Sequence, residues 1–70
     1  MKLYWANAKT ADLELLSTCE GCLNISEAIE QFQIWRDCGF NITEMWIEEC
    51  EGRKKIRDIK INSMVASEVE

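Results

Sequence analysis

The residues of this 70-residue chain that offer the most chemistry are its four cysteines. Cys19 and Cys22 form a CxxC motif, a spacing that can hold a metal ion or exchange a disulfide. A thioredoxin-type CxxC normally opens a helix within a parallel βαβ unit, and no such unit is predicted around Cys19. The other two thiols, Cys38 and Cys50, lie far along the chain. Whether the thiols share a site therefore depends on the elements between them.

The sequence gives little support for catalytic groups other than thiols. The chain has no histidine, which excludes an imidazole base, a Cys–His pair and any histidine metal ligand. Its three glycines are scattered and form no phosphate-binding loop. A catalytic carboxylate pair needs a defined pocket, which a domain this small rarely builds. Glu44 is the one acid that falls between apolar strand positions, and we expect it at a sheet edge or end. The sequence thus predicts no catalytic residue and no enzyme.

The clearest structural signal is a helix over residues 26–38. Ser26 is predicted to cap it, and Glu27 and Glu30 place negative charge in the first turn, where the helix dipole favours it. Gly39 is suited to the left-handed conformation that ends a helix. One face is apolar and carries Ile25, Ala28, Ile29, Phe32 and Trp35. Ile34 points away from this stripe, either as an ordinary exposed residue or as part of a contact surface.

This helix determines which thiols can meet. At ~1.5 Å per residue it separates Cys22 from Cys38 by roughly 20 Å. The strand that follows must run back, which carries Cys50 toward Cys19 and Cys22. Three thiolates lack the fourth ligand of a structural zinc site, although a glutamate or a second chain would complete it. We expect reduced cysteines and no cofactor, with zinc at Cys19, Cys22 and Cys50, or redox chemistry, as the alternatives.

The first part of the chain predicts a hairpin. Residues 2–8 have strand formers and alternation, and residues 9–12 form a plausible turn. The next segment alternates from Leu13 to Leu15 as a strand would, although Thr10 is also placed to cap a short helix over residues 11–20 that Gly21 would end. We favour the strand, because an isolated N-terminal strand needs a neighbour.

A second hairpin is predicted after Gly39, with a turn at Glu51 and Gly52. A two-residue loop there predicts the pairs Glu49–Lys54, Glu48–Lys55, Ile47–Ile56, Ile42–Ile61 and Trp46–Arg57, the last a cation–π pair. A three-residue loop instead predicts Met45–Ile59 and Thr43–Ile61. Either register places the basic cluster of Arg53, Lys54, Lys55 and Arg57 beside Glu48 and Glu49, so we interpret the cluster as charge pairing across the hairpin.

The predicted order is therefore β-β-α-β-β in a single α+β domain over residues 1–62, followed by a frayed tail over residues 63–70. It is a two-layer fold, with an antiparallel sheet and one helix packed on one face. A chain this short buries only ~60% of its unfolded surface, so its stability is marginal and a partner would help.

Composition limits the partners. The chain carries a net charge of −5. Residues 1–52 hold ten acidic and three basic residues, a net charge of −7, and residues 53–70 hold five basic and three acidic residues, a net charge of +2. Direct binding to nucleic acid is not expected, because it needs clustered lysine and arginine. No stretch resembles a signal peptide or a membrane span, so we expect a cytoplasmic protein without membrane contact.

These observations favour a small acidic interaction module or accessory subunit that binds a protein partner or self-associates. A sheet with one helix leaves one face uncovered, and apolar residues there usually indicate a partner. The residues predicted to bind it are Ile34, Met45, Ile47 and Ile56. Two alternatives stay open: an acidic inhibitor or nucleic-acid mimic that uses the carboxylates of the helix and of residues 44–51, and a cysteine-based zinc or redox protein.

Overall fold

The computed structural model describes residues 1–62 and has the predicted α+β architecture. Four antiparallel strands form one sheet, and one helix packs against it. In chain order the elements are β1 (Lys2–Thr10), β2 (Leu15–Ser17), α1 (Ile25–Asp37), β3 (Ile42–Glu51) and β4 (Lys54–Lys60). The prediction of a frayed tail over residues 63–70 lies outside the described residues.

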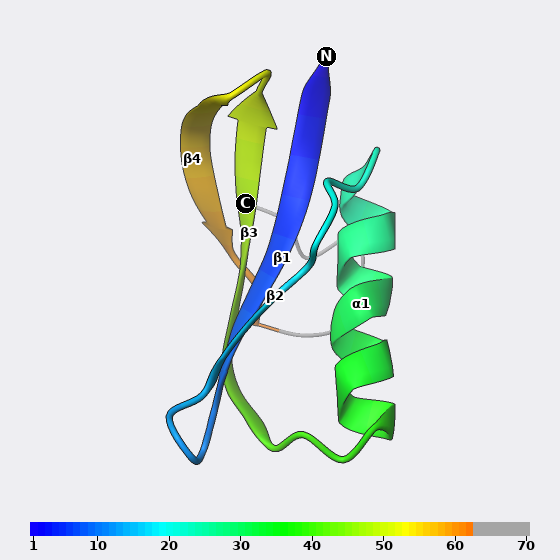
Figure 1. Ribbon diagram of the computed structural model, residues 1–70, viewed down its shortest axis with the longest axis vertical. Helices are drawn as coiled ribbons and strands as arrows, with labels where there is room; N and C mark the ends of the chain where they lie inside the picture. Colours follow the sequence, from blue (N-terminus) through cyan, green and yellow to red (C-terminus); the bar gives the residue numbers. More distant parts are fainter. Residues whose placement is uncertain (63–70) are drawn as a thin grey trace.

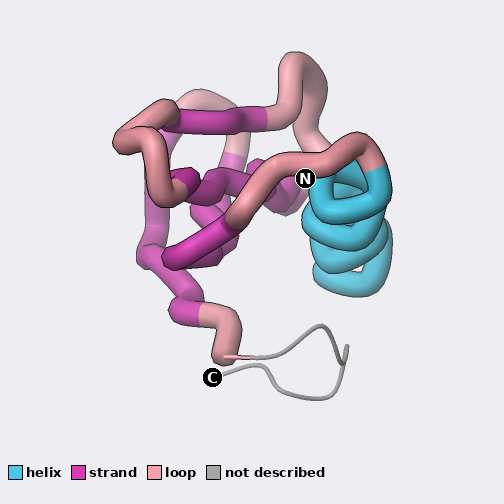
Figure 2. Tube along the Cα trace, turned by 90° about the horizontal axis from the view of Figure 1, so that it is seen from below, coloured by secondary structure: helices cyan, strands magenta, loops and turns pink. Residues whose placement is uncertain are grey.

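The sheet is built around its two longest strands. Its strand order is β2-β1-β3-β4, so β1 and β3 lie in the centre and are paired along their whole length. The helix runs beside the sheet on one side (Figure 1), and the view along the strands shows it as a single rod next to them (Figure 2). Only β1 and β3 make substantial contacts with α1. One face of the sheet is therefore covered by the helix, and the opposite face has no second layer within the described residues.

Helix α1 begins one residue earlier than predicted and has a different cap. The side-chain oxygen of Asn24 accepts a hydrogen bond from the backbone N–H of Glu27 at 2.9 Å. Asn24 has extended backbone angles, as an N-cap requires, whereas Ser26 already lies within the first turn. The prediction of Ser26 as the cap is wrong because Asn24, two residues earlier, reaches the same free amides.

The rest of the helix follows its sequence pattern. The fully or nearly fully buried residues of α1 are Ala28, Ile29 and Phe32, and Ile25 and Trp35 pack beside them. Gly39 follows the helix with a φ of +101°, the left-handed conformation predicted for it.

The first hairpin resolves the ambiguity over residues 11–20. A short strand, β2, pairs with β1 in the register Ala8 opposite Leu16, and no helix forms there. The turn is closed by Thr10, whose hydroxyl accepts a hydrogen bond from the Glu14 backbone at 3.1 Å. Leu13 adopts a φ of +68° within this turn. The expected strand is thus confirmed, although it has only three residues.

The second hairpin has neither predicted register. Glu51 pairs with Lys54 at the turn, so the loop consists of Gly52 and Arg53. Between Glu49 and Cys50 the register then shifts, because Ile56 is an extra residue in β4 and forms a β-bulge. Beyond it Ile47 pairs with Ile59, and Trp46 pairs with Lys60. The predicted Trp46–Arg57 pair is therefore wrong.

The core lies between the helix and the covered face. Ala6 and Ala8 of β1 are completely buried there, as are Ile47 of β3 and Ile59 of β4. Phe32 enters this layer from the helix and is also completely buried. Two small alanine side chains on the central strand let the helix approach closely, and Phe32 and the isoleucines fill the remaining space.

Candidate interaction surface

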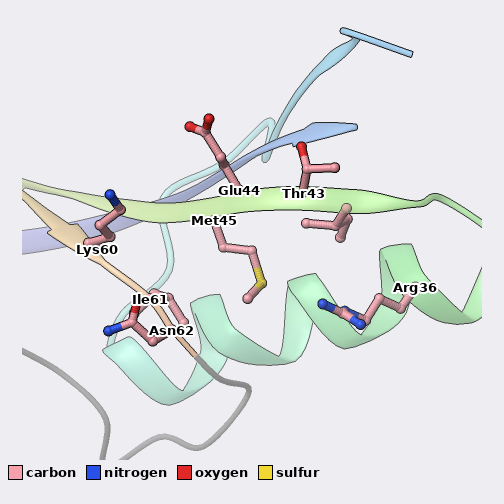
Figure 3. A pocket seen from close by; sticks show the side chains of 8 residues that line it. Arg36, Thr43, Glu44, Met45, Lys60, Ile61 and Asn62 are labelled. Carbon is pink, nitrogen blue, oxygen red and sulfur yellow. The ribbon is translucent and has the colours of Figure 1, made fainter. Parts of the chain in front are cut away.

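Alternation along the strands assigns each side chain to one face of the sheet. Directly opposite residues of antiparallel strands point to the same face, and neighbours along a strand point to opposite faces. Met45 and Ile47 pair with Ala8 and Ala6, which are buried beneath the helix. Met45 extends from β3 toward α1, whereas Glu44 beside it points away from the helix (Figure 3). Between Glu44 and Cys50, the residues of β3 with the parity of Glu44 therefore face away from the helix.

The predicted partner-binding residues do not form one surface. Met45 and Ile47 are 8% and 0% exposed and belong to the core, so their expected place on the uncovered face is corrected. Ile34 is 52% exposed on the helix, and Ile56 is 48% exposed at the bulge of β4. These two residues are accessible but lie on different elements, one in each layer of the molecule.

The face of the sheet that points away from the helix, here called the open face, carries a different set of side chains. The register places on it Leu15 and Ser17 of β2, Leu3, Trp5, Asn7 and Lys9 of β1, Glu44, Trp46, Glu48 and Cys50 of β3, and Lys55, Asp58 and Lys60 of β4. Charged residues thus surround apolar residues on this face.

Two tryptophans occupy the centre of the open face. Trp5 lies on β1 opposite Glu48, and Trp46 lies on β3 opposite Asn7, so the two indoles are diagonal neighbours on the central strand pair. Both are half-buried although no helix covers them. Within residues 1–62 neither indole N–H donates a hydrogen bond, and neither ring is paired with another aromatic ring.

A polar group lies beneath these indoles. Asn7 is only 7% exposed although it belongs to the open face, so its neighbours on that face shield it from water. Its side-chain oxygen accepts a hydrogen bond from the Ser17 hydroxyl at 2.6 Å, and its amide donates to the Trp5 carbonyl at 3.2 Å. These bonds satisfy the buried amide and join β2 to the centre of the sheet.

Sequence reasoning did not identify Trp5 and Trp46 as surface residues. The alternation of β3 offers two apolar sets, Met45 with Ile47 and Trp46 alone, and either fits a covered face. The informative signal lay in β1, where Ala6 and Ala8 alternate with Trp5 and Asn7. Small side chains mark the face of a strand that a helix approaches closely. The residues that alternate with these alanines, Trp5 among them, therefore belong to the uncovered face.

A shallow hollow lies beside Trp46. It has a volume of about 360 Å³, and its charged lining residues are Lys9, Glu44, Asp58 and Lys60. Lys9 is directly opposite Glu44, and Lys60 is directly opposite Trp46. Within the described residues the side chains of Lys9, Glu44 and Lys60 form no ion pair, whereas Asp58 accepts from Lys55 at 3.1 Å.

The basic hairpin residues do pair with Glu48 and Glu49, as expected, although Arg57 rather than Lys54 is the partner of Glu49. Arg57 donates to Glu49 at 2.6 Å, and Lys2 lies 3.1 Å from the same carboxylate. Glu49 is 3% exposed, and the hydrogen bonds from Arg57 and Lys2 hold its pKa below the usual range. Lys55 lies 3.9 Å from Glu48, the pair predicted from sequence. The carboxylates of residues 44–51 are divided between the two faces, so they form no single acidic surface.

Cys22 and Cys50 lie near one end of the sheet but on opposite faces, whereas Cys38 lies at the C-terminal end of α1. Cys22 forms a bridge opposite Tyr4 and packs against the core, whereas Cys50 is opposite Leu3 on the open face. Burial, followed by the charge of Glu27, raises the pKa of the Cys22 thiol. Within residues 1–62 no group of three or more cysteine or carboxylate side chains is arranged to hold a metal ion, and the described cysteines are free.

Two further hollows have no evident chemistry. One, of about 410 Å³, lies between the end of α1 and strands β3 and β4, where Arg36 faces Met45 and Ile61 (Figure 3). The other, of about 490 Å³, is bordered by the CxxC loop and Trp35. Gly21 of this loop lies so close to β1 that a Cβ there would approach the Leu3 Cβ to 2.9 Å. The small residue within the CxxC motif therefore has a packing role.

No protein-family model, curated protein or solved structure matches the chain. Among the described residues, the single helix is too short and too polar to cross a membrane.

Proposed function

We propose that this protein is a non-catalytic interaction module that binds a protein partner through the open face of its sheet. The observation that carries the proposal is the pair of half-buried tryptophans at the centre of that face, with indole N–H groups that lack acceptors in residues 1–62. Tryptophan is enriched where proteins bind each other, because its ring buries a large area and its N–H donates one directional bond.

The surroundings of the tryptophans support the same proposal. An apolar centre with a charged rim is the usual composition of a protein–protein interface. The rim is supplied by lysines and carboxylates of β1, β3 and β4. The hollow of about 360 Å³ on the open face is shallow and lined by both signs of charge. These features favour a broad protein surface as the partner over a small ligand.

The proposal involves no catalytic step and no bound cofactor. Its support is the absence of histidine and the separation of the cysteines between two faces of the sheet. The Glu49 carboxylate, whose pKa is lowered, is held by Arg57 and Lys2 rather than directed into a hollow. A carboxylate with two cationic partners has a structural reason for its lowered pKa.

The test is capture of a partner by the tagged chain from cells that express it naturally, compared with the double variant Trp5→Ala/Trp46→Ala. We expect the variant to lose the captured protein while keeping its far-UV circular dichroism. Ile34→Ala is the control, because it removes an exposed apolar side chain from the helix, away from the open face. Equal capture by the double variant and the native chain would refute the open face as the binding surface.

The same capture tests the alternative of an acidic mimic. A basic nucleic-acid-binding protein whose capture falls steeply with salt, and survives Trp5→Ala/Trp46→Ala, would favour the mimic. Capture that depends on the tryptophans and tolerates salt would favour the interaction module. The carboxylates Glu27, Glu30 and Asp37 of the exposed helix side are the residues to substitute in the first case.

A further inference from the structure

The charges of the open face differ from those of the whole chain. The chain carries a net charge of −5, but the open face holds three lysines, Lys9, Lys55 and Lys60, against three acids, Glu44, Glu48 and Asp58. Two copies of an acidic chain repel each other in most orientations. The balanced open face is the surface on which that repulsion is cancelled.

Part of this balance is not used within the chain. Lys55 is already paired with Asp58 at 3.1 Å and lies 3.9 Å from Glu48. Lys9, Lys60 and Glu44, by contrast, form no ion pair within residues 1–62. All three line the hollow beside Trp46, so unpaired charges of both signs surround a half-buried indole. A surface that carries both unpaired lysines and an unpaired carboxylate is complementary to a second copy of itself, because the lysines of each copy can pair with the carboxylate of the other.

We propose that the partner of the open face is a second copy of this chain, related to the first by a twofold axis close to Trp46. This inference rests on the proposed function and names its partner. In a twofold interface each contact occurs twice, so Glu44 of one protomer meets Lys9 and Lys60 of the other, and the reciprocal contacts follow. The indoles of Trp5 and Trp46 become buried between the two sheets.

The alternatives for this surface are weaker. Nucleic acid needs an excess of positive charge, and the charges of the open face cancel. Strand-to-strand pairing along the outer edge of β4 is hindered by the bulge at Ile56 and by the lysines of that strand. Stacking of the open faces avoids both difficulties.

The size of the face predicts a weak dimer. At ~3.3 Å per residue and ~4.8 Å between strands, the four-stranded sheet offers about 500 Å² of flat area. Stable interfaces bury about 800 Å² on each partner, so this one falls in the small, transient class. We therefore expect the monomer and the dimer to exchange, with the dimer filling at micromolar concentrations or above.

The test is sedimentation equilibrium of the intact chain across a concentration series, with charge-reversal variants. Glu44→Lys makes the unpaired set of residues 9, 44 and 60 wholly basic, and Lys9→Glu/Lys60→Glu makes the same set wholly acidic. We expect each variant alone to lose at least tenfold in dimer affinity and an equimolar mixture of the two to recover it. Glu30→Lys on the exposed helix side changes the net charge as Glu44→Lys does, and is expected to dimerise at least as well as the native chain.

Three outcomes would overturn the inference: a native chain that stays monomeric up to millimolar concentration, variants that dimerise unchanged, or a mixture that does not recover affinity. Circular dichroism of each variant verifies the fold before the comparison. A monomeric chain that still captures another protein through Trp5 and Trp46 would refute the second copy and leave the proposed function standing. A monomeric chain without that capture would refute both.

Discussion

The two faces of the sheet differ in the size of the side chains that the central strands present. On the covered face β1 presents Ala6 and Ala8, both completely buried because helix α1 lies directly upon them. On the open face the same strand presents Trp5, and its partner strand presents Trp46, with no layer above either from residues 1–62. Small residues allow a second layer to approach, whereas large residues shield the sheet where no layer exists. The side chains of the covered face therefore allow close packing against the helix, and those of the open face present a large apolar area.

This difference separates stability from binding. Close packing makes the covered face sensitive to the loss of single methylene groups. The open face carries half-buried side chains, so we expect changes there to affect association more than folding. The predictions that follow test this division, beginning with the largest effect.

Removal of the helix's main contact with the covered face should have the greatest effect. Phe32 is completely buried, and Phe32→Ala is expected to cost about 3–5 kcal/mol, which is comparable with the total stability of a domain this small. Urea denaturation followed by circular dichroism would show a chain that is largely unfolded at 25 °C. Ile34→Ala, two residues further along the helix, should change stability by less than about 0.5 kcal/mol. Similar effects of the two substitutions would contradict the assignment of helix faces.

We also expect a loss of stability at Gly21, where the CxxC loop approaches β1 closely. Gly21→Ala brings a Cβ within 2.9 Å of the Leu3 Cβ, an atom too near the backbone to move freely. We expect a cost of about 1–3 kcal/mol, as for other overpacked sites. Amide exchange should localise the damage, with faster exchange at Tyr4 and Cys22, whose amides bond to each other's carbonyls. Unchanged exchange at both positions would show that the CxxC loop packs elsewhere.

The start of the helix offers a matched pair of substitutions. Asn24→Ala removes the side-chain oxygen that accepts from the Glu27 amide, and should destabilise the protein by about 1 kcal/mol. Ser26 is the second residue of the helix, so Ser26→Ala should leave the stability of the protein unchanged or raise it slightly. Thermal unfolding of the two variants distinguishes the caps. A larger loss for Ser26→Ala would restore the prediction made from the sequence.

The smallest effect is expected from the ion pairs of Glu49. The pKa of Glu49 is lowered by Arg57 and Lys2, so its stabilisation is present above its ordinary pKa of 4.5 and is lost as the pH falls through the lowered value. Lys2 has a raised pKa because of Glu49, so its contribution is present below 10.5 and is lost only as the pH rises beyond that. Glu49→Gln should flatten both limbs of stability against pH. The measurement is the unfolding midpoint of the native chain and of Glu49→Gln across the pH range. Parallel curves for the two proteins would show that the ion pairs contribute nothing to stability.

The sequence contained enough to predict the architecture but not the exposed surface. Period and end signals identified α1, since Ala28, Ile29 and Phe32 share one side and Gly39 can adopt a positive φ. The turn at Gly52 identified the second hairpin. These features are local, and they determine secondary structure without reference to the rest of the chain.

Features that depend on pairing between distant strands were missed. The bulge at Ile56 shifts the register of β4 by one residue, and no local pattern in the strand marks it. The faces of Met45 and Ile47 were reversed because β3 has apolar residues on both parities, and only its pairing with Ala6 and Ala8 decides between them. The candidate surface depended on that parity, so it moved from Met45 and Ile47 to Trp5 and Trp46.

The most direct test of the open face as a self-association surface is the NMR spectrum of the three indole N–H groups as the protein is concentrated. Trp35 is an internal reference, because it lies on the helix in contact with Phe32. We predict that the signals of Trp5 and Trp46 shift or broaden with concentration while that of Trp35 stays fixed. Signals of Trp5 and Trp46 that remain unchanged, or a shift at Trp35 alone, would contradict self-association through the open face.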